Sequence, residues 1–184
     1  VVLPSVFSIC CLIRLRKILS KKMVRLFGLG SHPEMTEILF YHLERQPLDQ
    51  VLPSLLEKAR ERGWRAVIRT VSAERATTLD EHLWTYREES FLAHALASHA
   101  GPGEEPIVIA VDESDLNQPQ VSFHIEGAPL PSSPQSYERI VVLFDGNDAA
   151  ALETARQQWK DIRDQGLAAT YWQQNEQGRW EKKA

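Results

Sequence analysis

The sequence predicts a single α/β domain built on a mainly parallel sheet with helices on both faces. Short apolar runs, typical of buried strands, alternate with segments in which apolar residues recur every three or four positions, as in a helix with one buried face. The order strand, helix, glycine, strand also occurs near both ends of residues 35–184. Such alternation favours parallel strands that are covered on both sides. A chain of 184 residues, 43% hydrophobic and 25% charged, is typical of one globular domain.

The first predicted unit joins two strands through one helix. Ile38–Tyr41 is a short apolar run suited to a buried strand. A helix is predicted after Pro47, because apolar residues recur with a helical period over residues 48–59. Gly63 is expected to end this helix, since a left-handed cap favours glycine. Residues 66–68 then form the second predicted strand.

The middle of the chain is predicted to add one helix and two strands. Ser72 is a good N-cap for a helix over Ala73–Leu83. The following segment, Thr85–His99, has no clear period and is expected to be irregular. Residues 107–111 form a continuous apolar strand, whereas residues 121–125 alternate between apolar and polar, which predicts a half-exposed strand.

The last predicted unit follows the proline- and serine-rich loop Pro129–Pro134. Ile140–Phe144 is the most continuous apolar run of the chain, so we expect it to be a central strand. A helix is predicted over Ala149–Arg163 with Gly166 as its cap, and a final strand over Ala168–Trp172. The remaining residues are mostly polar.

Residues 1–34 differ from the rest of the chain in composition. They hold six of the 21 basic residues, one of the 25 acidic residues and both cysteines. A signal peptide has its charges before the apolar run, whereas here they lie within it and after it. The apolar run Val6–Ile13 is too short to span a bilayer. We expect residues 1–34 to be a non-native or disordered extension before a start at Met23 or Met35, with a membrane-touching amphipathic arm as the alternative, and residues 35–184 to be the folded domain.

The charge of the folded part disfavours direct contact with DNA. With 15 basic and 24 acidic residues, residues 35–184 carry a net charge of about −9. Domains that bind nucleic acid usually have a basic excess, so we expect no direct, non-specific DNA binding. No cysteine lies in these residues, which excludes a disulfide framework or a cysteine-based zinc site there and fits a reducing cytoplasm.

The sequence contains no motif that predicts catalysis. Neither common glycine-rich phosphate loop occurs, and there is no G-x-S-x-G elbow. Phe144 and Asp145 resemble the strand end and acid of ATPases, but without a phosphate loop they are more typical of a core strand that ends in a turn. The six histidines do not pair at metal-ligand spacing. We therefore predict no catalytic residue, metal or cofactor; a nucleotide-dependent enzyme is the alternative, because the fold class alone permits one.

Two groups of residues are candidates for binding a partner. Arg156, Lys160 and Arg163 recur at helical spacing and share one face of the last predicted helix. This face adjoins an apolar stripe with Trp159, so it could bind a short acidic peptide that ends in an apolar side chain. The same pattern also occurs on solvated helices, where the charges would pair with Glu153 and Asp164.

The second candidate is an aromatic pair. Trp84 lies off the apolar stripe of its predicted helix, and Phe91 follows in a segment expected to be irregular. Exposed aromatic residues of this kind indicate a partner-binding patch. The alternative is that both side chains fold back over the sheet.

Three separate segments resemble one protein family. Leu79–Trp84 and Glu89–His94 are similar to the signature of the chi subunit of bacterial DNA polymerase III, in which L-D-x-x-L-W is followed by serine-phenylalanine and a histidine. Glu37–Leu43 resembles the first strand of that family, and Ala155–Lys160 resembles its C-terminal helix. The resemblance covers residues 35–180 in the same order and spacing, which favours Met35 as the natural start.

This resemblance implies a Rossmann-like α/β fold without catalysis. Chi-like proteins link the clamp-loader complex to single-stranded DNA-binding protein by binding its acidic, phenylalanine-terminated C-terminal tail. The matching positions for the tail are Arg156 and Lys160, with Trp159 as the family's aromatic residue and Arg163 as a further basic residue. Trp84 and Phe91 match positions that chi-like proteins use toward a psi subunit or a helicase.

Overall fold

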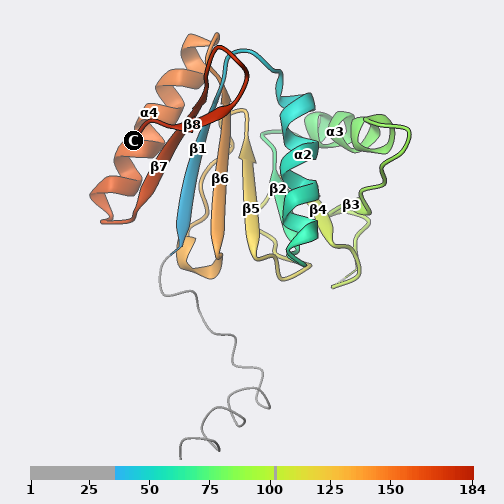
Figure 1. Cartoon of the computed structure of the whole chain (residues 1–184). Coiled ribbons are helices and arrows are strands. Elements are labelled where there is room, and N and C mark those ends of the chain that lie inside the picture. The colour runs from blue at the N-terminus through green and yellow to red at the C-terminus, as the bar shows by residue number, and fades with distance from the viewer. Residues whose placement is uncertain (1–35, 102) are drawn as a thin grey trace, which may run out of the picture. The chain divides into compact units, whose positions relative to one another are not determined.

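The strands of the computed structural model, which describes residues 36–101 and 103–184, form one eight-stranded sheet (Figure 1). The strand order is β3-β4-β2-β5-β6-β1-β7-β8, and all neighbours are parallel except β7 and β8. The bounds are β1 Glu37–Leu43, β2 Ala66–Arg69, β3 His94–Leu96, β4 Ile107–Ala110, β5 Val121–Ile125, β6 Arg139–Asp145, β7 Ala169–Gln174 and β8 Trp180–Lys182. The predictions about residues 1–34 lie outside the described residues.

Helices cover both faces of this sheet, as predicted. Their bounds are α2 Leu48–Glu61, α3 Ala73–Thr85 and α4 Ala149–Asp164, with a short 3-10 helix η1 at Pro134–Ser136. Alternate strand residues face opposite layers: Leu39 and Leu43 of β1 belong to the core under α2 and α3, whereas Ile38 and Phe40 belong to the core under α4. Figure 1 shows α2 and α3 at one end of the sheet and α4 at the other. The predicted mainly parallel α/β fold is confirmed.

The predicted helix ends have a local physical cause. Ser72 is the N-cap of α3, and its side chain accepts a hydrogen bond from the Arg75 backbone N–H at 3.2 Å. Gly63 and Gly166 follow α2 and α4 with φ values of 75° and 74°. In each case the next backbone N–H returns to a carbonyl of the last turn, which satisfies that carbonyl.

Two strands were not predicted. β3 and β8 have three residues each and lie at the two edges of the sheet. β3 falls in the segment Thr85–His99 that was expected to be irregular, and β8 falls in the polar C-terminal segment. Three residues are too few to show a strand period, because such strands form by pairing with a neighbour that is already in place.

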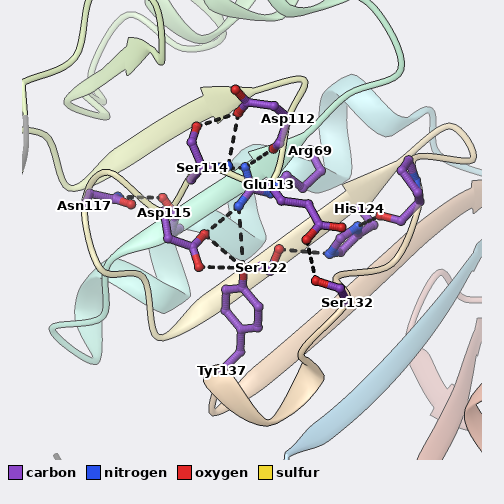
Figure 2. A network of polar contacts seen from close by, with 12 residues as sticks. Arg69, Asp112, Glu113, Ser114, Asp115, Asn117, Ser122, His124, Ser132 and Tyr137 are labelled. Atoms are coloured by element: carbon purple, nitrogen blue, oxygen red, sulfur yellow. Dashed lines mark hydrogen bonds and ion pairs between the residues drawn. The ribbon is translucent and has the colours of Figure 1, made fainter.

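The prediction that residues 121–125 form a half-exposed strand is wrong, because all five residues are buried. β5 lies between β2 and β6, and the chain after it folds back over its second face. Ser122 and His124 are buried as a hydrogen-bonded pair at 2.9 Å, and His124 Nδ1 donates to the Pro129 carbonyl at 2.7 Å (Figure 2). The polar residues of the alternation therefore face partners inside the protein rather than water.

A buried ion pair extends this polar layer beside β5. Arg69 of β2 is 4% exposed, and its guanidinium contacts the Asp115 carboxylate at 2.5 Å (Figure 2). The Tyr137 hydroxyl donates to the same carboxylate at 2.8 Å. Burial raises the pKa of Tyr137, so this hydroxyl keeps the proton that it donates. Loops thus cover the part of this face that α4 does not reach.

None of the helices in residues 36–101 and 103–184 has the length and apolar content needed to cross a membrane. Within these same ranges, no group of three His, Cys, Asp or Glu side chains is placed to hold a metal ion.

Candidate functional site

Helix α4 carries the first predicted site on its outer side. Asp148 is its N-cap and accepts a hydrogen bond from the Ala150 backbone N–H at 2.8 Å. Ala155 and Ile162 are buried against the sheet, whereas Leu152 and Trp159 of the same apolar stripe are only half-buried. The stripe is therefore only partly covered, and the uncovered part opens into a pocket.

This pocket, which we name the α4 pocket, has a volume of about 660 Å³. It lies between α4 and the ends of β1, β6 and β7. Its lining residues are Phe40, His42, Glu44, Phe144, Gly146, Leu152, Ala155, Arg156, Trp159, Tyr171 and Ala184. The Trp159 ring meets the rings of Phe40 and Tyr171 edge-on, with centroid distances of 5.2 and 6.3 Å. Five of these eleven lining residues therefore carry aromatic rings, and the exposed Arg156 lies among them.

The three predicted cations differ in their relation to the pocket. Arg156 lines it and lies 3.5 Å from Glu153, but the two side chains are 70% and 76% exposed, so this ion pair is weak. Lys160 and Arg163 are exposed on the same helix face, outside the lining. Neither forms an ion pair within 4.0 Å of another described residue, so of the two pairings in the alternative interpretation, the one with Glu153 occurs and the one with Asp164 does not.

Several pocket residues were not predicted. His42 is stacked on Phe144 with a centroid distance of 5.2 Å, and its Nδ1 is hydrogen-bonded to the Tyr171 hydroxyl. Gly146 leaves room for this imidazole, because a Cβ there would lie 1.8 Å from His42 Nε2. Strand alternation could have placed Phe40, His42 and Phe144 on the α4 side, but the sequence could not show that α4 leaves them partly open.

The Tyr171 hydroxyl is protonated at neutral pH. Burial raises its pKa, the nearby Glu44 carboxylate raises it further, and the Arg156 guanidinium opposes them. The polar part of the pocket therefore combines the Tyr171 hydroxyl, held by His42, with the Arg156 guanidinium and the Glu44 carboxylate.

Trp84 and Phe91, the second predicted site, lie together on the surface. Their side chains are 55% and 71% exposed, and the ring centroids are 5.7 Å apart. Trp84 also contacts the buried His94 ring of the edge strand β3, at 4.9 Å. The alternative that both aromatics fold back over the sheet is wrong.

The usual ligand position of an α/β sheet lies at the carboxyl ends of β1 and β6, because the helices that follow them, α2 and α4, cover opposite faces. A crevice of about 440 Å³ lies there. The acids in its lining are Glu44, Asp49, Glu126 and Asp145. Two arginines also line it: Arg45, and Arg75, which is paired with Asp49 at 3.0 Å and Glu126 at 2.8 Å. This excess of carboxylates disfavours phosphate, so the crevice gives no support to a nucleotide-dependent enzyme.

Comparison with known proteins gives a consistent result. A family model described as DNA polymerase III chi subunit, HolC, matches residues 35–170. A Rickettsia prowazekii protein described as a probable DNA polymerase III subunit chi is 23% identical over 117 residues, which span 60% of this chain and 71% of that protein. The DNA polymerase III subunit chi of Pseudomonas aeruginosa is 26% identical over 117 residues, which span 64% of this chain and 80% of the relative. Because the family model matches most of the chain, the protein belongs to the DNA polymerase III chi subunit family.

Proposed function

We propose that this protein is a non-catalytic subunit of a bacterial DNA polymerase III holoenzyme that binds the acidic C-terminal tail of single-stranded DNA-binding protein. The observation that carries the proposal is the α4 pocket, in which an aromatic wall adjoins Arg156 on a helix face that continues with Lys160 and Arg163. A replication role of this kind belongs in the cytoplasm and in the clamp-loader complex.

The pocket supports this proposal because it offers a contact for each kind of group in the tail, the aromatic ring and the carboxylates. The terminal phenylalanine ring would enter the space between Phe40, Trp159 and Tyr171, where edge-on contacts between rings are favourable. The terminal carboxylate would meet the Arg156 guanidinium, and charge-assisted hydrogen bonds of this type are stronger than neutral ones. Lys160 and Arg163 would then contact the aspartates that precede the phenylalanine.

The exposed pair Trp84 and Phe91 is the proposed contact for a second partner, either a psi subunit or a helicase. It lies on α3 and the segment before β3, whereas the α4 pocket lies over the other half of the sheet. Two separate surfaces would let the protein hold both partners at once, as an adaptor requires.

The experiment that tests the tail site is a calorimetric titration with synthetic peptides. A peptide that ends in Asp-Ile-Pro-Phe should bind, whereas the same peptide with its last residue changed to alanine should bind at least tenfold more weakly. A third peptide with an amidated C-terminus isolates the carboxylate contact with Arg156. Equal affinity for all three would show that the pocket does not recognise the end of the tail.

A further inference from the structure

The sheet face under α2 has an aromatic surface that the tail site does not use. Tyr41 of β1, Trp172 of β7 and Trp180 of β8 all pack half-buried at the edge of the core under α2 and α3. The rings of Tyr41 and Trp172 are nearly parallel at 6.2 Å, and Trp180 meets Tyr41 edge-on at 4.8 Å. Trp64, from the connection after α2, completes the group on the same side.

Cations are interleaved with these rings. The guanidinium groups of Arg62 and Arg139 each lie 5.2 Å from the centroid of the Trp64 ring. Lys58 of α2 and Arg62, which caps the end of that helix, are exposed. Arg139 Nε donates a hydrogen bond to the Glu37 carboxylate at 2.8 Å. Lys182 of β8 is exposed and pairs in register with Trp172.

These residues enclose a groove between α2 and the sheet. It has a volume of about 300 Å³, and its lining includes Tyr41, Trp64, Trp172, Lys58, Arg62, Arg139 and Glu37, the carboxylate that pairs with Arg139. Trp180 and Lys182 lie beside this lining, next to Tyr41 and Trp172. Burial raises the pKa of the Tyr41 hydroxyl and the Glu37 carboxylate adds to this increase, whereas the Arg139 and Arg62 guanidinium groups oppose it. We name this surface the aromatic–cationic groove.

We propose that the aromatic–cationic groove binds single-stranded nucleic acid. Flat rings on which bases stack, alternating with cations that meet the phosphates, are the combination that single-strand binding sites use. The groove is recessed between α2 and the sheet, so a duplex, whose bases are already paired and stacked, cannot place a base on its rings. An acidic peptide would use the cations but would supply few flat groups for the rings of Tyr41, Trp64 and Trp172.

The net negative charge of the folded domain should weaken binding of nucleic acid at the groove. Residues 35–184 carry a net charge of about −9, from which no direct, non-specific DNA binding is expected. The groove departs from that expectation because Lys58, Arg62 and Arg139 gather locally around its rings, and the binding should be weak and depend strongly on salt. The groove belongs to the face covered by α2, whereas the α4 pocket belongs to the opposite face, so the two sites do not overlap. The proposal therefore does not depend on the tail site.

Tryptophan fluorescence of the full chain, titrated with a single-stranded oligothymidylate, tests the proposal. All five tryptophans lie in residues 64–180, so binding at the groove should change the emission directly. With two or three phosphate contacts, raising salt from 50 to 200 mM should weaken binding roughly tenfold. Trp172→Ala should weaken it by a further factor of roughly ten, through loss of stacking.

Matched charge changes locate the site. The double variant Arg62→Glu/Lys182→Glu should abolish the saturable fluorescence change and leave binding of the tail peptide intact. Arg45→Glu changes an exposed arginine outside the groove and should have little effect on oligonucleotide binding. Arg156→Glu should weaken tail binding and spare oligonucleotide binding, so the two proposals fail independently.

Three results would overturn the groove proposal. The first is the absence of saturable binding at 50 mM salt. The second is full binding by Arg62→Glu/Lys182→Glu, as expected if the basic residues 1–34 made the contact. The third is displacement of the oligonucleotide by an acidic peptide that binds the groove more tightly, which would make the groove a peptide site.

Discussion

Trp159 is half-buried because its ring closes one side of a pocket instead of filling the core. Its neighbour on the helix surface, Arg156, is exposed and held only by a weak ion pair. The spacing of these two side chains on α4 could be predicted from the helical period. The opposite wall could not, because Phe40, Phe144 and Tyr171 come from three strands whose order in the sheet the sequence does not specify.

His124 should make stability depend on pH. Its imidazole is 1% exposed and neutral, with Nδ1–H donating to Pro129 and Nε2 accepting from Ser122. Burial lowers its pKa to about 4, and the Arg69 guanidinium adds to this. Between about pH 4 and about pH 6.5 the unfolded chain binds more protons than the folded chain. The stability that His124 contributes is therefore fully present above about pH 6.5 and is lost as the pH falls toward 4. The expected loss between pH 7 and pH 5 is about 2 kcal/mol.

Urea denaturation of the wild type and His124→Gln at pH 7 and pH 5 measures this effect. The variant lowers stability at both values but should lose the part of the pH dependence that His124 supplies. A variant with the same pH dependence as the wild type would show that the imidazole is not the titrating group.

Phe91→Ala should separate partner binding from folding. The side chain is 71% exposed, so its loss should change the free energy of unfolding by less than about 0.5 kcal/mol. Exposed aromatic anchors at interfaces cost about 2 kcal/mol or more when truncated, which is roughly a thirtyfold loss of affinity. Calorimetric melting checks the first value, and a titration with the purified psi subunit or helicase checks the second. A melting temperature lowered by many degrees would instead make Phe91 a folding residue.

At the scale of elements, long helices and continuous strands were predictable and short edge strands were not. α2, α3 and α4 have helical apolar periods and local end signals, and β6 is one continuous apolar run. β3 and β8 depend on pairing with β4 and β7. β5 was misjudged because alternation shows which side chains are polar but not whether a loop will cover them.

Gly166→Ala tests the helix ends. Gly166 has a φ of 74°, and a Cβ there meets no atom within 4 Å, so the cost of the change is that of the backbone conformation alone. We expect a loss of about 1–2 kcal/mol in the free energy of unfolding, measured by urea denaturation. Gly178→Ala, in the turn before β8, has the same φ of 74° and equally open surroundings and serves as the matched comparison. No loss in either variant would contradict the assigned left-handed conformations.

At the scale of the whole molecule, the buried residues of both apolar cores all lie between residues 38 and 169. The Thr36 hydroxyl secures the start of β1, because its single proton lies between the carbonyl oxygens of Pro134 and Tyr137, which are 3.1 and 2.9 Å from Oγ1. The fold class, the two-sided covering and the family resemblance all followed from the sequence. The aromatic–cationic groove could not be predicted from the sequence. Its rings and charges come from α2, the connection after it and several strands, and they meet only in the folded sheet.

Deleting residues 1–34 should leave the domain intact. The remaining chain keeps both cores and the Thr36 hydrogen bonds, so we expect its melting temperature to stay within about 2 °C of the full chain, a change below about 0.5 kcal/mol. Tail-peptide affinity should also be unchanged. A loss of several degrees would show that the deleted segment contributes to the fold.

The most direct test of the central claim is titration of the tail peptide into Arg156→Glu and Lys160→Glu. Each charge-assisted hydrogen bond is worth about 1.5–3 kcal/mol, so either variant should bind about tenfold to a hundredfold more weakly, with added repulsion from the acidic tail. Both side chains are exposed, so melting should be unchanged, and Lys58→Glu on the opposite side of the sheet should bind normally. Higher salt should weaken wild-type binding. Wild-type affinity in both Arg156→Glu and Lys160→Glu would contradict the assignment of the α4 pocket as the tail site.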